Sequence, residues 1–329
     1  EPTYNNIVDY IVRITYRIWE DRDVEYIADT YAPDSVVFDD YGLKDSNAKI
    51  ISDTYHTTGA FSDIVLDARE VIWAGDDDIG WRSSHRLMIA GTNDGDSNYG
   101  AATGKKTEYL CLANCVTKAN DIYLEQVLYN SCAMLMQLGI DPKEEAARLA
   151  KSPPGGWPRD AATWERLRTE GGPKKPISLA EPVDGFDPDE FARRIHNTLF
   201  NNKDVDSAYA NFVDGFSFEN ASLRQGSGRD AHSAMLSEIL DTLSDISFQV
   251  DEVYWMGNDE EGYLVSTRWS MDAVHAKDGI YDASTNAPLQ IWGITQHEIQ
   301  VGKIAQEWML FNEMDVMIQI AHARMEHST

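Results

Sequence analysis

The first residues of the chain show the spacing of an amphipathic helix. Between residues 5 and 23, large apolar side chains recur every three or four positions, at Ile7, Ile11, Ile14 and Ile18. Residues at this spacing share one face of an α-helix, so the pattern predicts a helix that buries this face. Phe191, Ile195 and Leu199 repeat the pattern later in the chain, where Asp187 or Asp189 is suited to cap the helix.

Other segments have the composition of β-strands. Four runs rich in branched and aromatic residues are bounded by Gly, Asp and Asn, at residues 63–76, 79–92, 106–120 and 121–130. They predict a meander of antiparallel strands. With the helices that precede them, they predict an α+β fold in which a curved antiparallel sheet packs against helices. The concave side of such a sheet is a common place for a small ligand.

The chain contains this pattern twice. Residues 62–86 and 244–268 are identical at 11 of 25 positions, and the same offset of 182 relates Glu125 to Glu307 and Asn130 to Asn312. A repeat of this length indicates a duplicated domain, and two copies make a tandem pair rather than a solenoid.

A change in composition separates the two copies. Residues 151–185 are rich in Pro, Gly and charge, as inter-domain linkers are. We therefore predict a first domain at residues 1–150, a linker at 151–185 and a second domain at 186–329. Trp157 and Trp164 suggest that the linker packs on a surface.

The charge of the chain excludes some classes of partner. Lys and Arg number 28 and Asp and Glu number 55, which gives a net charge of −27. Such a surface repels phosphate backbones and anionic lipids, so neither nucleic acid nor a membrane is expected as a partner. The sequence has no run of about 18 apolar residues, so no transmembrane helix is expected. Three cysteines, Cys111, Cys115 and Cys132, argue against a disulfide framework and for a reducing, cytoplasmic location.

Several segments resemble SnoaL-like polyketide cyclases of the NTF2-like superfamily. They are "EWMLFNEMDVMIQI" near the end of the chain, "LANCVTKANDIYLEQ" with "MQLGID" in the first copy, and "HAKDGIYDASTNAP" before "GITQHEI" in the second. The resemblance covers both copies and implies tandem NTF2-like cones that pair as an intrachain pseudo-dimer, with a homodimer of the whole chain as a further option. This superfamily includes cyclases, isomerases, dehydratases and mute binding modules.

The resemblance also draws attention to two asparagines. In such cyclases an Asp four residues after the Trp of the last strand projects into the pocket as a general acid/base. Here Asn312 follows Trp308 by four residues, and Asn130 takes the matching place in the first copy. An amide forms hydrogen bonds but takes no proton near pH 7. Each Asn either orients a carbonyl or hydroxyl in a pocket wall or caps the helix that follows.

Two arginines occupy equivalent strand positions. Arg268 and Arg86 could hold a carboxylate or an enolate with two parallel hydrogen bonds. We favour the alternative, a salt bridge to Glu307 or Glu125 on a neighbouring strand, because the acid is duplicated together with the base.

The second copy also offers a candidate base. His275 lies where the family often has a His, and nearby Asp272 could tune its pKa for proton transfer; an exposed loop His is the alternative. Gln296 and Asn114 fall where the family often has another His, and His297 lies beside Gln296. An aromatic pocket lining could come from Tyr99, Tyr281, Trp81, Trp255 and Trp292, and Trp308 is a further predicted substrate-binding residue. For His232 and His56, on the predicted third helix of each copy, we favour packing or surface roles.

Together these features predict a cofactor-independent enzyme with no metal site. It would act by proton transfer on a small carbonyl-bearing organic substrate, as a cyclase, isomerase or dehydratase. His275 or Asp272 would be the base, and Asn312 and Arg268 would hold the developing oxyanion. The alternative is a catalytically mute protein that binds a small molecule in the same pocket.

Overall fold

The computed structural model describes residues 3–152, 161–169 and 185–327. The chain divides into two compact units, Glu1–Glu145 and Ala146–Thr329, called unit 1 and unit 2 below. The domain boundaries at residues 150 and 186 stay a prediction.

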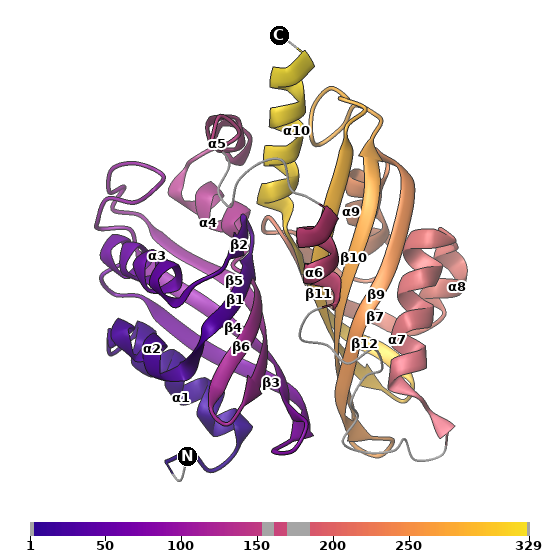
Figure 1. Ribbon diagram of the computed structural model, residues 1–329. Coiled ribbons are helices and arrows are strands. Elements are labelled where there is room, and N and C mark those ends of the chain that lie inside the picture. The colour runs from indigo at the N-terminus through magenta and orange to yellow at the C-terminus, as the bar shows by residue number, and fades with distance from the viewer. Residues whose placement is uncertain (1–2, 153–160, 170–184, 328–329) are drawn as a thin grey trace. The chain divides into compact units, whose positions relative to one another are not determined.

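Unit 1 places helices against a six-stranded sheet (Figure 1). Its first helices are α1 (Ile7–Trp19), a 3₁₀ turn (Val24–Tyr26), α2 (Ile27–Thr30) and α3 (Asn47–Ala60). The strands are β1 (Tyr31–Asp39), β2 (Gly42–Lys44), β3 (Val65–Asp76), β4 (Gly80–Thr92), β5 (Lys106–Lys118) and β6 (Asp121–Leu128). Two helices follow the sheet, α4 (Ser131–Leu138) and α5 (Pro142–Leu149).

Unit 2 repeats this order of elements (Figure 1). Its helices before and between the strands are α7 (Pro188–His196), a π-turn (Asn197–Asn201), α8 (Val205–Tyr209) and α9 (Arg229–Leu240). The strands are β7 (Phe212–Asn220), β8 (Gln225–Ser227), β9 (Leu243–Asn258), β10 (Gly262–His275), β11 (Pro288–Gln300) and β12 (Lys303–Phe311). The last helix is α10 (Glu313–His327).

The two sheets have the same topology. Their strand orders are β2-β1-β6-β5-β4-β3 and β8-β7-β12-β11-β10-β9. The predicted α+β class, the tandem repeat and the antiparallel four-strand meander are therefore confirmed. One strand pair in each sheet is parallel rather than antiparallel: β1 with β6 in unit 1, and β7 with β12 in unit 2. A parallel pair needs a long crossover connection, and α3 with the strands up to β6 supplies it.

The opening helices form as their sequence predicts. In α1 the side chain of Asn6 accepts a hydrogen bond from the backbone N–H of Asp9, and the four isoleucines are buried. Asp187 caps α7 by accepting from the N–H groups of Asp189 and Glu190. Leu199 is buried as expected, but it lies on the π-turn rather than on a continuous α-helix.

Part of the predicted linker is a helix. Residues 161–169 form α6 (Ala161–Thr169), and the carbonyl of its buried Leu167 accepts a hydrogen bond of 2.8 Å from Arg268 Nη1. This contact ties α6 to the sheet of unit 2. Trp157 lies outside the described residues, and Trp164 is half-buried.

The hairpin between β9 and β10 needs a glycine at its start. Gly257 has a φ of +111°, and a Cβ added there would lie 2.1 Å from the carbonyl oxygen of Gly262. Gly75 and Gly80 repeat this arrangement in unit 1, again with 2.1 Å between the added Cβ and the carbonyl oxygen. Glycine is thus required at the matching position of both copies for the same steric reason.

We expect Gly257→Ala to destabilise unit 2 by about 3 kcal/mol or more, because it adds a backbone clash to the strain of positive φ. Gly215→Ala is the matched control, because Gly215 also has a positive φ, +71°, but nothing lies within 4 Å of its added Cβ. The control is expected to lose only about 1–2 kcal/mol. Urea unfolding read by hydrogen exchange of unit 2 peptides measures both, and equal losses would contradict the clash.

Candidate active site

A small cavity lies on the concave side of the unit 2 sheet. Its volume is about 10 Å³, roughly enough for one water molecule. Helices α7 and α9 and the π-turn form one wall, and strands β11 and β12 form the other. The lining residues are Ile195, His196, Leu199, Phe200, His232, Leu236, His297, Glu307 and Met309.

A buried carboxylate between two imidazoles dominates this cavity. Glu307 on β12 is 4% exposed. Its Oε1 lies 2.8 Å from Nε2 of His232 on α9, and its Oε2 lies 2.9 Å from Nε2 of His297 on β11. Because an ionised carboxylate only accepts, each Nε2 donates, and both oxygens of Glu307 are satisfied.

The outer nitrogens of the two histidines differ in their surroundings. Nδ1 of His232 lies 2.7 Å from the hydroxyl of Tyr209, which extends the chain of hydrogen bonds toward α8. Nδ1 of His297 is buried and has no hydrogen-bond partner among the described residues. A third imidazole, His196, lies with its ring centroid 5.5 Å from that of His297, and its Nδ1 lies 2.8 Å from the carbonyl of Ala192.

Burial and charge act in opposite directions on this cluster. Burial alone would raise the pKa of Glu307, but its interactions with His232 and His297 outweigh burial and hold that pKa below its ordinary value. Burial, with the neighbouring His297, lowers the pKa of His196 to about 4, so His196 is neutral at pH 7. The cluster therefore holds an ionised carboxylate in hydrogen-bond contact with two imidazoles.

Unit 1 has a cavity at the matching place, with a volume of about 50 Å³. Glu125, the counterpart of Glu307, lines it from β6, and Tyr31 O–H donates to Glu125 Oε2 at 2.8 Å. The histidines are missing: Cys115 stands in place of His297, and Ile50, the fourth residue of α3, stands in place of His232, the fourth residue of α9. Burial therefore raises the pKa of Glu125 to about 7, and the Tyr31 hydrogen bond offsets this only in part.

The strand residues that line the cavities are the sequence neighbours of those predicted to line the pockets. On β12 and β6 the cavities are lined by Glu307, Met309, Glu125 and Val127, and successive strand residues point to opposite faces. Trp308, Gln296, Trp292 and Asn114 therefore point to the face away from the cavities. Gln296, Trp292 and Asn114 are buried and Trp308 is half-buried, and both amide atoms of Asn114 lack a hydrogen-bond partner among the described residues.

The arginines lie on that opposite face as well. Arg268 is 1% exposed; its Nη1 lies 3.4 Å from Asp251 and its Nε 3.9 Å from Glu252. The salt bridge that we favoured, to Glu307, is not formed, since Glu307 points to the cavity. Arg86 is half-buried and is paired in register with Glu70 rather than Glu125.

Asn312 holds neighbouring elements together, and its Oδ1 does not accept from a backbone N–H of α10 as the helix-capping alternative predicts. It is completely buried; its Oδ1 accepts from the Trp292 N–H at 3.0 Å, and its Nδ2 donates to Asp315 at 3.0 Å and to the Gln290 carbonyl at 3.3 Å. These bonds join the end of β12 to β11 and to the first turn of α10. Asn130 is buried at the N-terminus of α4 with a φ of +49°, and its side chain forms no capping hydrogen bond.

The structure does not bring His275 and Asp272 together. His275 is fully buried, not on an exposed loop, and its Nδ1 lies 3.2 Å from Thr285 Oγ1, whereas Asp272 is exposed. Tyr281, also buried, donates to Glu313 at 3.0 Å, and the half-buried Tyr99 shares a hydrogen bond with Tyr41. None of these residues lines either cavity.

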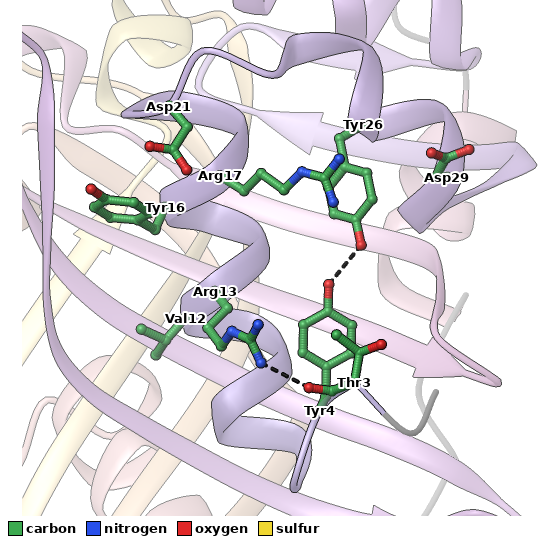
Figure 2. A pocket seen from close by; sticks show the side chains of 9 residues that line it. All are labelled: Thr3, Tyr4, Val12, Arg13, Tyr16, Arg17, Asp21, Tyr26 and Asp29. Carbon is green, nitrogen blue, oxygen red and sulfur yellow. Dashed lines mark hydrogen bonds between the residues drawn. The ribbon is translucent and has the colours of Figure 1, made fainter.

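Figure 2 shows a wider groove on unit 1, of about 690 Å³, on the outer side of α1. The Arg17 guanidinium stacks 3.4 Å from the ring centroid of Tyr26, and the hydroxyls of Tyr26 and Tyr4 are 2.6 Å apart. Arg13 donates to the Thr3 carbonyl at 2.8 Å. Neither Glu125 nor Glu307 lines this groove.

The second half of the chain matches a known family. Residues 190–320 match the family model for SnoaL-like polyketide cyclases. These residues belong to that family. The sequence-based recognition is thereby confirmed, and the matched range holds His196, His232, His297 and Glu307. No curated protein matches the chain.

Among solved structures, three similar proteins each correspond to about two-fifths of this chain. AclR from Streptomyces galilaeus, provisionally described as a hydroxylase, is 18% identical with a TM-score of 0.35 and covers 41% of this chain and 98% of its own. IdmH from Streptomyces antibioticus, provisionally described as a polyketide cyclase, is 19% identical with a TM-score of 0.35 and covers 40% and 98%. A provisionally described SnoaL-like polyketide cyclase from Jannaschia sp. CCS1 is 12% identical with a TM-score of 0.36 and covers 42% and 98%.

Metal clusters and membrane-spanning helices are both absent from the described residues. Within residues 3–152, 161–169 and 185–327, no group of three or more His, Cys, Asp or Glu side chains is placed to hold a metal ion. Over the same ranges, no helix has the length and apolar character needed to cross a membrane.

Sequence reasoning missed the residues that meet in the unit 2 cavity. It treated Glu307 as an ion-pair partner and favoured a packing or surface role for His232. Two features of the sequence could have pointed to them. Glu307 and its counterpart Glu125 are carboxylates inside apolar strands, and His232 and His297 have no histidine counterpart in the first copy.

The two buried acids predict opposite effects of Glu→Gln. The pKa of Glu125 is higher in the folded than in the unfolded chain, so unit 1 loses stability as the pH rises from about 4.5 to about 7, by at most about 3 kcal/mol. Glu125→Gln should therefore stabilise unit 1 at pH 8 and not at pH 4. The pKa of Glu307 is lowered, so its contribution is present above its ordinary pKa and is lost as the pH falls; Glu307→Gln should destabilise unit 2 at pH 8.

Both effects are tested by urea unfolding at pH 4 and pH 8. Hydrogen exchange of peptides from each unit gives the urea concentration at which that unit is half unfolded. Each variant serves as the control for the unit that it does not alter. A loss of stability in unit 1 of Glu125→Gln at pH 8 would contradict the assignment of a costly buried charge.

Asn312→Asp tests the residue that departs from the family pattern. The added carboxylate would face Asp315 and the Gln290 carbonyl, both acceptors, so we expect a loss of about 1–3 kcal/mol and no gain of activity. Asn286→Asp, at an exposed position of the same unit, is the control and should change stability little. Thermal unfolding measures both, and a gain of catalysis in Asn312→Asp would show that the residue reaches the cavity.

Proposed function

We propose that unit 2 is a cofactor-independent enzyme that transfers a proton at a carbon next to the carbonyl of a small organic substrate. The carrying observation is the Glu307–His297 pair: Glu307 accepts a hydrogen bond from Nε2–H of His297, and the buried Nδ1 of His297 has no hydrogen-bond partner within the described part of the chain. In a neutral imidazole whose Nε2 donates, Nδ1 carries a lone pair. His297 is therefore the base, and Glu307 orients it and stabilises the imidazolium that forms.

The chemistry follows from these positions. Nδ1 of His297 removes a proton from the carbon, and the electrons of the C–H bond move into the carbonyl to form an enolate. Where the enolate is conjugated with a C=C bond, return of the proton from the imidazolium to the far carbon of that bond completes an isomerisation. Where the enolate carbon attacks a second carbonyl, the new C–C bond forms, and the alkoxide takes the proton from the imidazolium to complete an aldol-type cyclisation. His232, between Glu307 and Tyr209, provides a second imidazole for proton return.

Entry of a substrate requires movement of one wall. The cavity of about 10 Å³ holds no organic substrate as it stands. Leu199 and Phe200 line it from the π-turn, and such turns within helices are often found at functional sites. This turn is the element that we expect to move, because the other wall is paired sheet.

The same small volume favours a second candidate function. A cavity that stays closed to carbonyl compounds would make unit 2 a catalytically mute member of the family that binds only water or a very small ligand. The two candidates differ in whether a ketone reaches His297 Nδ1.

Deuterium exchange at the α-carbons of simple ketones in D₂O, followed by NMR, tests the proposal. We expect the protein to accelerate exchange and His297→Gln, which cannot act as a base, to reduce the acceleration by about 100-fold or more. Glu307→Gln should reduce it less, since the base remains. The control is His56→Gln, the same change at an exposed histidine of unit 1, which should keep the full rate.

The proposal fails if His297→Gln exchanges ketone protons as fast as the unaltered protein. Saturable ketone binding without any acceleration of exchange would instead support the mute binding protein.

A further inference from the structure

The unit 1 cavity differs from its unit 2 counterpart in size and chemistry. Its volume of about 50 Å³ takes roughly four water molecules, or an organic molecule of a few non-hydrogen atoms. Most of its wall is apolar, with Ile11, Ile14, Ile18 and Leu87 among the lining residues. This composition suits a small, mainly apolar ligand.

Two polar groups lie at different sides of this cavity. His85 on β4 and Glu125 on β6 both line it, and β5 runs between their strands. Two inter-strand spacings separate the strands by about 10 Å. A ligand with an oxygen at each end could therefore meet both groups.

His85 is an unpartnered polar group inside the wall. It is 2% exposed, and its Nε2 is buried with no hydrogen-bond partner among the described residues. A buried ring nitrogen without a partner costs free energy, which a ligand oxygen would recover. His85 is the observation that points to a ligand rather than to an empty packing defect.

A groove connects this position with the surface. Thr15, Leu66 and His85 line both the cavity and an outer groove of about 580 Å³ beside α1, β3 and β4. Glu125, Tyr31 and Tyr129 are half-buried rather than fully enclosed. The groove and the cavity therefore adjoin each other at His85, which is the side from which we expect a small molecule to enter.

The cavity has little formal charge. Burial lowers the pKa of His85 to about 4, so the ring is neutral at pH 7. Glu125, with a pKa raised by burial to about 7, is protonated in a large share of molecules at that pH and then donates a hydrogen bond. A charged ligand would lack a counter-charge here, whereas a neutral oxygen compound finds both hydrogen-bonding groups.

The cysteines in the wall do not suggest covalent chemistry. Cys111 and Cys115 line the cavity, and burial raises the pKa of both thiols well above the ordinary value. Protonated thiols are poor nucleophiles, so they act as part of the apolar wall.

We infer that unit 1 carries a separate binding site for a small uncharged oxo- or hydroxy-compound, held between His85 and Glu125 and reached along the groove at His85. The site is not a second copy of the acid/base centre, because the counterparts of His232 and His297 are Ile50 and Cys115. The inference does not depend on the function proposed for unit 2.

Histidine-selective ¹⁵N NMR of the full chain with hydroxyacetone as the probe tests the site. We expect a saturable shift of the His85 ring signal, assigned by its loss in His85→Leu. Propionate, with the same number of non-hydrogen atoms but a negative charge, should give no saturable shift. Ala113→Leu adds bulk to the cavity wall without removing a polar group and should weaken hydroxyacetone binding by about tenfold or more.

Ligand-detected saturation transfer measures the variants that lack the reporter ring. His85→Leu should weaken binding by about fivefold or more, and His56→Leu, the same change at an exposed position of unit 1, should leave it unchanged. Amide spectra check that each variant is folded. If Ala113→Leu does not fold, the test of the binding site rests on His85→Leu alone.

Three results would overturn the inference. They are no saturable shift up to about 100 mM hydroxyacetone, equal binding of propionate, and binding that is unchanged in the folded cavity variants. Failure of the unit 2 proposal gives a different pattern, because His297→Gln should leave the His85 response intact whether or not unit 2 exchanges ketone protons.

Discussion

A carboxylate inside an apolar sheet must be either neutralised or paired, and both units have one at the same strand position. Glu125 and Glu307 lie on β6 and β12, the strands that come last along the chain in each unit, and they point to the concave side of the sheet, under the helices. Transfer of an unpaired carboxylate to such a place costs several kcal/mol. The surroundings of each acid therefore decide what its cavity is able to do.

The two units solve this constraint differently. In unit 1 a single hydrogen bond from Tyr31 leaves the pKa of Glu125 raised by burial, which favours an uncharged acid in an apolar cavity. In unit 2 two imidazoles donate to Glu307 and keep it ionised. Only the second arrangement places an ionised carboxylate against two imidazoles, the contact on which the proposed acid/base chemistry rests. The first arrangement is better suited to hold a neutral molecule.

Several residues predicted for the pocket lie off the cavities for a geometric reason. Asn312 and Asn130 were considered for the pocket wall through the family position of an acid four residues after Trp308, and Gln296 through a position where the family often has a His. Along a strand the side chains alternate, so an error of one residue moves a whole set of side chains to the opposite face. The residues of the cavity were close by in sequence: Glu307 beside Trp308, His297 beside Gln296 and His85 beside Arg86.

The sequence by itself determined the duplication, the α+β class, the opening helices and the antiparallel meander, because these depend on local periodicity and on internal identity. The family of residues 190–320 could also be recognised from it. Only the tertiary structure decided which strand face is concave, since both faces carry buried side chains and alternation alone cannot tell them apart. It also decided that His196, His232 and His297 meet at Glu307, because that meeting depends on how α7 and α9 pack over β11 and β12, elements that are distant in sequence.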